Sequence, residues 1–441
     1  MNRFLVRKAA VLGAGVMGAQ IAAHLVNVGV PVILYDLPAR DAPKNATVLK
    51  ALAALAKAKP APLALADDAR SIEPANYDDD LARLGECELV IEAIAERLDV
   101  KRELYRKVAP HLAPQAIFAS NTSGLSIAAL ADALPEPLRP RFAGLHFFNP
   151  PRYMFLVELV AAPQTDPAVL DALETFATTT LGKGVVRAND TPNFIANRVG
   201  TAGLLATLRH AEAFGLPIDV VDDLTGKKLG RASSGTLRTA DLVGLDTLGH
   251  VIETMQRSLA DDPFHPSFAT PPALAALLAR GALGQKTGAG FYRKAGRERQ
   301  RFDAARGDYV PAGGKADALV ERILKRPPAE RLKLLRESKH PQAQFLWSVL
   351  RDGFHYAAVH LAAIAAQARD VDLALRWGFG MREGPFELWQ AAGWTQVARW
   401  VQDDIDAGRA LAPVPLPGWV FEGPVAATGG VHGPEGSWSA A

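Results

Sequence analysis

The chain has 441 residues, of which 49% are hydrophobic and 22% are charged. It is too long for a single hydrophobic core, so we expect roughly two to four domains with the composition of a soluble globular protein. Its 49 Lys and Arg nearly balance its 47 Asp and Glu, which argues against a nucleic-acid-binding protein. The single cysteine, Cys87, excludes an intrachain disulfide framework and favours a reducing compartment.

The first residues predict a cytoplasmic protein. They lead directly into a glycine-rich motif, with no apolar segment of signal-peptide form before it. No stretch reaches the roughly 18 unbroken apolar residues that a membrane span requires. We therefore expect no membrane partner, and the balanced charge predicts no nucleic-acid partner. No metal ligands are predicted.

A dinucleotide-binding motif begins the chain. Residues 8–12 are a short apolar run, after which "GAGVMG" leads into a helical pattern, so strand, turn and helix are predicted. Gly13, Gly15 and Gly18 match the fingerprint in which the first glycine makes the turn, the second admits a pyrophosphate and the third lets helix pack on strand. The next predicted strand, "VPVILYD", ends in Asp36, whose carboxylate would accept hydrogen bonds from a ribose and repel a 2′-phosphate. The motif predicts NAD, unless Asp36 is only a structural loop aspartate.

The alternation of strands and helices continues as far as about residue 188, which predicts an α/β Rossmann-type doubly wound parallel sheet. A helical insertion is expected near residues 40–70, with lysines that face either solvent or an anionic substrate. The predicted strands are residues 88–94, 116–120 and 141–148, the predicted helices are residues 98–109 and 126–134, and the lysines are Lys44, Lys50, Lys57 and Lys59.

Polar residues at the ends of these strands are candidates for a site, because open parallel sheets bind ligands there. Ser123 follows one strand closely, and His146 and Asn149 lie at the end of another. Glu158 lies in an apolar run, where an ionised carboxylate needs a partner. If the cofactor is NAD, alcohol oxidation needs a base such as His146, and Glu158 could orient it. The alternative is a core histidine bonded to a backbone carbonyl, with the glutamate bound to an arginine.

Four motifs in register, "VLGAGVMGAQIA", "ASNTSGLSI", "GLHFFNPP…VELV" and "DTPNFIANR", resemble the (S)-3-hydroxyacyl-CoA dehydrogenase family. The resemblance runs from about residue 5 to 295 and more weakly to about 411, and it is greatest to the dehydrogenase part of long bifunctional fatty-acid oxidation enzymes. It implies that His146 is the base, that Glu158 is its partner and that Ser123 and Asn197 position the substrate oxygens. It also places Glu96, Lys101 and Asn149 near the cofactor.

The resemblance implies reversible, NAD-dependent oxidation of (S)-3-hydroxyacyl-CoA to 3-ketoacyl-CoA in fatty-acid β-oxidation. Two alternatives stay open: a dehydrogenase of the same fold that acts on a small hydroxy acid, and a non-catalytic subunit that binds NAD or acyl-CoA. Long relatives carry a hydratase module, so a hydratase module or subunit is a further candidate partner.

The segment "NDTPNFIANRVG" predicts the beginning of the next domain. Asp190 or Thr191 can cap a helix whose first turn begins with Pro192, a residue tolerated at that position. Asn193 and Asn197 would then lie four residues apart on one face of the helix.

The rest of the chain predicts two all-α domains that arose by internal duplication, because residues 211–247 resemble residues 365–395. This similarity leaves open whether the protein is a homodimer or a monomer with an internal pseudo-dimer. The Pro- and Gly-rich tail is expected to be extended or mobile. The predicted divisions are residues 1–188 for the NAD-binding domain, 189–295 for the first helical domain, 296–340 for a linker and surface helix, 341–411 for the second helical repeat and 412–441 for the tail.

Overall fold

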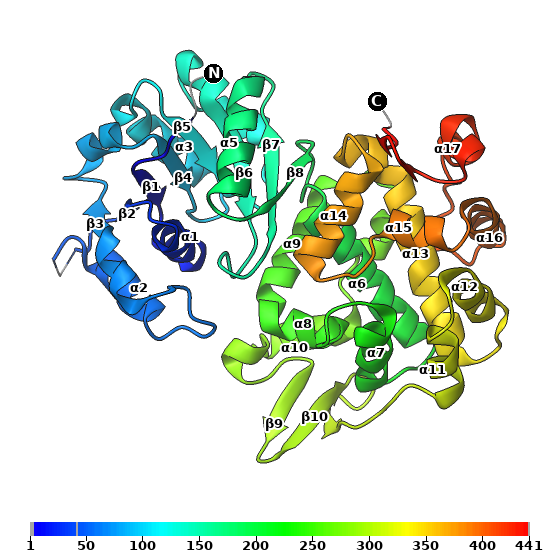
Figure 1. The fold of residues 1–441 in the computed structure, drawn as a ribbon. Coiled ribbons are helices and arrows are strands. Elements are labelled where there is room, and N and C mark those ends of the chain that lie inside the picture. Colours follow the sequence, from blue (N-terminus) through cyan, green and yellow to red (C-terminus); the bar gives the residue numbers. More distant parts are fainter. Residues whose placement is uncertain (1–3, 41–42, 440–441) are drawn as a thin grey trace. The chain divides into compact units, whose positions relative to one another are not determined.

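The computed structural model describes residues 4–40 and 43–439. It divides into two compact units, Met1–Phe194 and Ile195–Ala441 (Figure 1). No helix in the described ranges is both long and apolar enough to cross a membrane.

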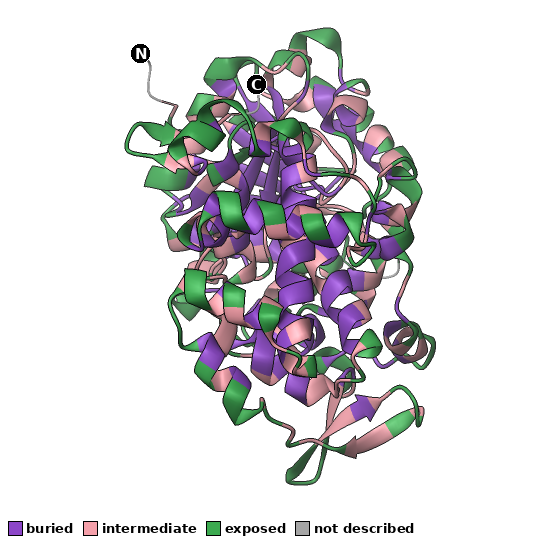
Figure 2. Ribbon diagram, turned by 90° about the vertical axis from the view of Figure 1, so that its right-hand side faces the viewer, coloured by how far each residue is buried: buried purple, intermediate pink, exposed green. Residues whose placement is uncertain are grey.

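The first unit contains an eight-stranded sheet in the order β3-β2-β1-β4-β5-β6-β7-β8. The order reverses at β1, so right-handed crossovers place helices on both faces of the sheet and leave a ligand site beyond the carboxyl ends of β1 and β4. Figure 2 shows much of this sheet as buried. The strands are β1 Ala9–Leu12, β2 Val32–Asp36, β3 Ile72–Asn76, β4 Leu89–Glu92, β5 Ile117–Ser120, β6 Phe142–Phe147, β7 Leu156–Ala161 and β8 Gly184–Ala188. The helices are α1 Val16–Asn27, α2 Ala46–Leu55, α3 Leu98–Val108, α4 Ile127–Ala131 and α5 Pro167–Thr179.

The predicted doubly wound sheet is confirmed, with two additions. The segment predicted as a helical insertion does contain α2, and residues 41 and 42 of that prediction lie outside the described ranges. It is followed by β3, an edge strand that the sequence pattern did not predict, because Pro74 interrupts a short run and proline is tolerated only at such edges. β7 runs antiparallel to β6, since the connection between them is too short for a parallel crossover.

The second unit is mainly helical, and α6 packs along α13 at its centre. Its helices are α6 Ala196–Ala213, α7 Ile218–Thr225, α8 Thr236–Val243, α9 Leu245–Ser258, α10 Pro272–Ala279, α11 Ala318–Leu324, α12 Pro328–Glu337, α13 Pro341–Ile364, α14 Ala368–Phe379, α15 Pro385–Ala391, α16 Trp394–Asp406 and α17 Gly423–Thr428. The described part also holds the strands β9 Tyr292–Ala295, β10 Glu298–Asp303, β11 Asp308–Pro311, β12 His432–Gly433 and β13 Gly436–Ser437.

The segment 296–340, predicted to be a linker and surface helix, is more structured than expected. β9, β10 and β11 form an antiparallel sheet that overlaps its beginning, and α11 and α12 follow. Several of the charged residues that suggested a linker lie on β10, where Phe302 is the one buried residue. Charge density alone was therefore a misleading signal, because a small sheet can keep charges on its outer face.

The predicted duplication is confirmed by hydrogen bonds that recur in both halves of the second unit. Asp222 of α7 accepts from the N–H of Leu237 at the beginning of α8, over 2.6 Å. Asp372 of α14 accepts from the N–H of Phe386 at the beginning of α15, over 2.8 Å. Each carboxylate is also contacted by a side chain from later in its repeat. The hydroxyl of Tyr292 donates to Asp222, and the imidazole of His432 contacts Asp372.

The Pro- and Gly-rich tail belongs to this repeated pattern, so the expectation of an extended or mobile segment was wrong. Gln390 accepts from the backbone N–H groups of Val431 and His432, as Asp241 does from those of Phe291 and Tyr292 in the first repeat. The tail thus closes the second repeat as residues 281–292 close the first. It packs through apolar residues that its composition concealed, namely Leu416, Val420, Val425 and Val431.

Candidate functional site

The glycine motif makes a tight loop between β1 and α1. Gly13 has a φ of 106°, and a Cβ built there would lie 2.7 Å from the carbonyl oxygen of Ala93, beyond β4. A Cβ on Gly18 would lie 1.8 Å from the oxygen of Gly13, so α1 approaches β1 only because Gly18 has no side chain. A Cβ on Gly15 would meet nothing within 4 Å. The space at Gly15 and the N–H groups of the first turn of α1 fit a pyrophosphate.

Asp36 ends β2 beside this loop. Its Oδ2 accepts from the N–H of Ala14 and its Oδ1 from the N–H of Leu37, each over 2.7 Å. Both bonds fix the carboxylate, and each oxygen keeps a second lone pair. The glycines and Asp36 therefore fit the adenosine half of a dinucleotide, with the carboxylate available to ribose hydroxyls.

His146 and Glu158 face each other directly across the antiparallel pair of β6 and β7. His146 Nδ1 lies 2.8 Å from Glu158 Oε2, and the two side chains are 4% and 0% exposed. The ring of His146 also lies between aromatic neighbours, with centroid distances of 4.5 Å to Phe148 and 5.7 Å to Phe194. A carboxylate at Nδ1 holds the proton on that nitrogen, so Nε2 is the acceptor in the neutral ring.

Ser123 lies in a loop after β5 that two contacts hold in place. Glu96, in the loop after β4, accepts from the hydroxyl of Thr122 at 2.6 Å and from the N–H of Ser123 at 2.7 Å. Asn121 Oδ1 accepts from the N–H of Phe147, the residue after His146. The first unit thus joins the Ser123 loop to the strand that carries His146, and Glu96 acts there as a positioning group.

Lys101 is buried in α3 rather than displayed on the surface. Its ammonium lies 2.5 Å from Oε1 of Glu92 and 3.5 Å from Oε2 of Glu96. Glu92, fully buried at the end of β4, also accepts from the hydroxyls of Tyr105 and Ser120, each over 2.7 Å. Sequence analysis missed Glu92, although a carboxylate inside the apolar run "ELVIEAI" is the same kind of signal that identified Glu158.

The segment between β6 and β7 is held from two sides. The amide of Gln20 on α1 donates to Asn149 Oδ1 over 3.2 Å. The buried ammonium of Lys183 donates to the carbonyl of Met154 over 2.8 Å and also to that of Pro151. Burial lowers the pKa of Lys183 to about 8. Lys183 is a second residue that the sequence patterns did not reveal.

The prediction for residues 190–197 was wrong in two respects. Asp190 caps α4 rather than the next helix, since its carboxylate accepts from the N–H groups of Ile127 and Ala128. Asn193 has a φ of 62° and Phe194 a φ of 52°, so Asn193 is not on the face of α6, which begins only at Ala196. These left-handed residues place Phe194 against His146, and a Cβ on Gly124 would lie 2.5 Å from Asn193 Oδ1. Left-handed non-glycine residues are costly and concentrate at functional sites.

Asn197 lies in the first turn of α6, at the beginning of the second unit. The first unit therefore brings together His146, Glu158, Ser123 and Glu96, whereas Asn197 belongs to the other unit. The neighbouring Arg198 anchors this turn, because its guanidinium lies 3.0 Å from Asp262 Oδ2 and 3.1 Å from the hydroxyl of Tyr356. Within the described ranges, no cluster of His, Cys, Asp or Glu could hold a metal ion.

A Rossmann-type unit with a histidine–carboxylate pair at its strand ends, followed by a helical unit, defines the class of dinucleotide-dependent dehydrogenases. Comparisons with known proteins agree. Residues 8–191 match the NAD-binding domain of 3-hydroxyacyl-CoA dehydrogenase, and residues 194–294 match its C-terminal domain. The chain belongs to the 3-hydroxyacyl-CoA dehydrogenase family, whose members are NAD-dependent oxidoreductases.

Two relatives carry the name "Probable 3-hydroxyacyl-CoA dehydrogenase". The one from Deinococcus radiodurans is 46% identical over 67% of this chain and 85% of its own length. The one from Bacillus subtilis is 37% identical over 94% of this chain, which spans only 56% of that protein. The crystal structure of 3-hydroxybutyryl-CoA dehydrogenase from Escherichia coli K12 is similar in fold, with a TM-score of 0.69. The two sequences are 25% identical, and the match covers 92% of this chain and 95% of that one.

Proposed function

We propose that the protein catalyses the NAD-dependent, reversible oxidation of (S)-3-hydroxyacyl-CoA to 3-ketoacyl-CoA in fatty-acid β-oxidation. The observation that carries this proposal is the buried contact of 2.8 Å between His146 Nδ1 and Glu158 Oε2, in the unit that matches an NAD-binding domain. A binding subunit has no need of a base with an orienting carboxylate. Family membership and the names of the relatives support a CoA thioester as substrate.

His146 acts as the general base in this scheme. Its Nε2 removes the hydroxyl proton while the hydrogen on the same carbon leaves as hydride, and the carbon–oxygen bond becomes a carbonyl. Bound NAD supplies the hydride acceptor. Glu158 stabilises the imidazolium that forms and keeps Nε2 directed at the hydroxyl. In the reverse direction the same imidazolium returns its proton to the carbonyl oxygen.

Ser123 and Asn197 are proposed to position the substrate oxygens by hydrogen bonds. The bonds that Glu96 makes to the Ser123 loop support this role, because they fix the backbone that carries the hydroxyl. Holding the reacting carbon in place is worth as much to the rate as the base itself in many enzymes.

The packing of α6 on α13 within one chain supports a monomer with an internal pseudo-dimer over a homodimer. Because the chain spans 56% of the Bacillus subtilis relative, a hydratase module or subunit stays a prediction.

The test is a steady-state assay of NADH oxidation with acetoacetyl-CoA, run beside free acetoacetate. We expect turnover with the thioester only, and His146→Ala should lower kcat by at least about a hundredfold, the usual cost of losing a general base. NADH affinity, measured by fluorescence titration, should be unchanged in this variant. Asp36→Ala provides the opposite control, with weaker NADH binding and an intact fold.

Three results would contradict the proposal. Turnover of free acetoacetate alone would indicate a dehydrogenase of small hydroxy acids. Tight NADH binding without turnover of either compound would indicate a binding subunit. Full activity of the His146→Ala variant would show that His146 is not the general base, even if the CoA thioester is the substrate.

A further inference from the structure

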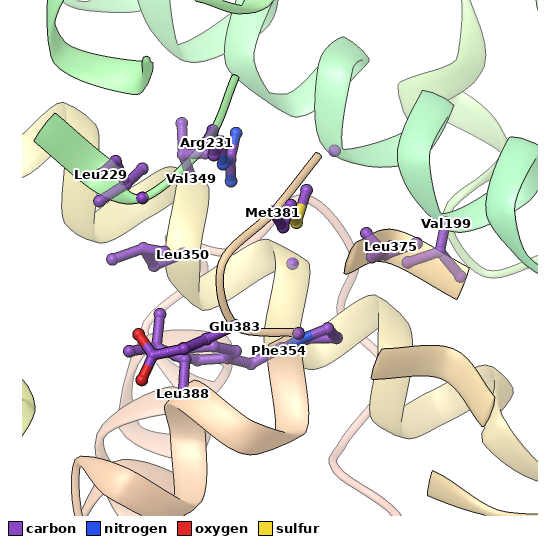
Figure 3. Close-up of a pocket in the computed structure, with 15 residues that line it drawn as sticks. Val199, Leu229, Arg231, Val349, Leu350, Phe354, Leu375, Met381, Glu383 and Leu388 are labelled. Atoms are coloured by element: carbon purple, nitrogen blue, oxygen red, sulfur yellow. The ribbon is translucent and has the colours of Figure 1, made fainter. Parts of the chain in front are cut away.

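A pocket lies within the second unit, where the two helical repeats meet (Figure 3). Its walls come from α6, α13, α14 and α15 and from the loops that follow α7 and α14. Its volume of about 60 Å³ exceeds the roughly 10–15 Å³ that one water needs on this measure, so it can hold a molecule of about four to six heavy atoms. The site is not part of the proposed active site.

The lining comes in corresponding pairs from the two repeats. Val199 of α6 corresponds to Val349 of α13, and Gly203 of α6 corresponds to Gly353 of α13, because each pair has the same separation in the sequence as Asp222 and Asp372. A Cβ on either glycine would meet nothing within 4 Å. Glycine inside a helix costs about 1 kcal/mol relative to alanine, so two of them in matching places leave space at a cost in stability.

One pair breaks this correspondence. Arg231 follows α7, and Met381 occupies the matching place after α14. The guanidinium of Arg231 forms no hydrogen bond or ion pair with any part of the chain that the structure describes, and burial lowers its pKa to about 10, so it stays charged at neutral pH. Arg231 is partly exposed, so solvent reaches it, but a guanidinium that loses part of its hydration without gaining a partner is unfavourably placed.

The buried arginines of the unit are paired with carboxylates. Arg198 is paired with Asp262, and Arg351 is paired with Asp352 and Asp404. Glu383 also lines the pocket, but its carboxylate lies 4.0 Å from the guanidinium of Arg331. Figure 3 shows the oxygens of Glu383 on a different side of the lining residues from the nitrogens of Arg231. The charge of Arg231 is therefore left for a ligand.

We propose that this pocket binds a small carboxylate with a short aliphatic tail. The planar guanidinium of Arg231 receives the carboxylate through paired hydrogen bonds. The tail lies against apolar side chains that include Val199, Phe354 and Leu375. Inorganic phosphate is a poorer occupant, because the opposite walls offer apolar surface to an anion that is hydrated on all sides.

The test is binding of butyrate to the full chain, measured by ligand-observed NMR or calorimetry. For about six heavy atoms we expect a Kd on the order of 1 mM. Arg231→Met, which gives the first repeat the residue of the second, should weaken butyrate at least about tenfold, in line with the loss of a charged hydrogen bond. Arg382→Gln, a change at an exposed arginine next to the pocket residues, should leave the Kd unchanged.

Two further measurements keep the proposal testable if Arg231→Met does not fold. Gly353→Val places a side chain in the pocket and should abolish butyrate binding while Arg231 is retained. Inorganic phosphate and 1-butanol, which supply the charge and the tail alone, should each bind at least about tenfold more weakly. Equal binding of phosphate, undiminished butyrate binding in either pocket variant, or no butyrate binding at tens of millimolar, about ten times the expected Kd, would overturn the proposal.

Discussion

The two helical repeats share one frame of hydrogen bonds but present different residues on it. Asp222 and Asp372 both accept from the first turn of the next helix, and both repeats end in a closing segment. The predicted substrate residue Asn197 corresponds instead to Trp347, which is buried and donates to Asp404 over 2.8 Å. At this position the second repeat has a core residue where the first has the predicted substrate residue, which predicts that the second repeat supports the first.

The largest expected effect comes from removing the segment that completes the second repeat. Deleting residues 412–441 takes away four buried Leu and Val side chains, each worth roughly 1.5–3 kcal/mol, so the second repeat should lose more than about 5 kcal/mol of unfolding free energy. Urea denaturation followed by tryptophan fluorescence measures this loss. The matched control is deletion of residues 440–441 alone. An unchanged midpoint in the longer deletion would show that the repeat does not need its closing segment.

A smaller effect concerns the buried carboxylates of the shared frame and depends on pH. Burial raises the pKa of Asp222 to about 6, and the pKa of Asp372 is raised to the same value for the same cause. The folded state therefore binds this proton more tightly than the unfolded state, whose aspartate titrates near 4. The associated stability is fully present below about pH 4 and is lost as the pH rises to about 6.

Asp222→Asn should remove this pH dependence. Two pKa units correspond to about 3 kcal/mol, so the unfolding free energy of the variant relative to the wild type should rise by about that much between pH 4 and pH 7. The relative unfolding free energy of Asp372→Asn should change in the same direction if the two repeats are equivalent. Burial acts to raise the pKa of Asp223, but hydrogen bonds from Ala316 and Lys228 hold it below its ordinary value. The unfolding free energy of Asp223→Asn relative to the wild type should therefore fall as the pH rises. If the unfolding free energies of all three variants changed with pH in parallel with that of the wild type, the assigned pKa shifts would be contradicted.

The smallest effect separates function from support at the corresponding positions of α6 and α13. Asn197→Ala should lower kcat/KM about ten- to a hundredfold, equivalent to roughly 1.4–2.7 kcal/mol, with little change in Tm, because a substrate hydrogen bond is lost. Trp347→Phe should lower Tm and leave kcat/KM nearly unchanged. The reverse pattern in assays with acetoacetyl-CoA would assign the supporting role to α6.

Much of the first unit was predictable because its signals are local. An apolar run, three glycines at fixed spacing and a carboxylate at the end of the next strand specified β1, α1, β2 and the position of Asp36. His146 and Glu158 were expected to meet, and they do. The edge strand β3 could not be predicted from the same signals, since Pro74 disfavours a strand except at an edge, and only the sheet order reveals the edge.

The errors have a common physical cause, which is that composition does not report long-range contacts. The tail is rich in Pro and Gly, but Gln390 is far from it in the sequence and supplies its hydrogen bonds. Asp190 looked like a cap for the next helix and instead caps α4, a preceding one. The resemblance placed Lys101 near the cofactor, but its ion pair with the buried Glu92 was not predicted.

The direct opposition of His146 and Glu158 across β6 and β7 has a consequence for how this protein can vary. Their separation is set by the backbone ladder, so it does not depend on the sequence of the segment 148–155 that joins the two strands. That segment carries Asn149 and is fastened by Gln20 and Lys183, residues outside both strands. Substitutions or insertions there can therefore change the contacts of this segment without displacing His146 or Glu158, which makes it the place where ligand specificity can vary at least cost to the pair.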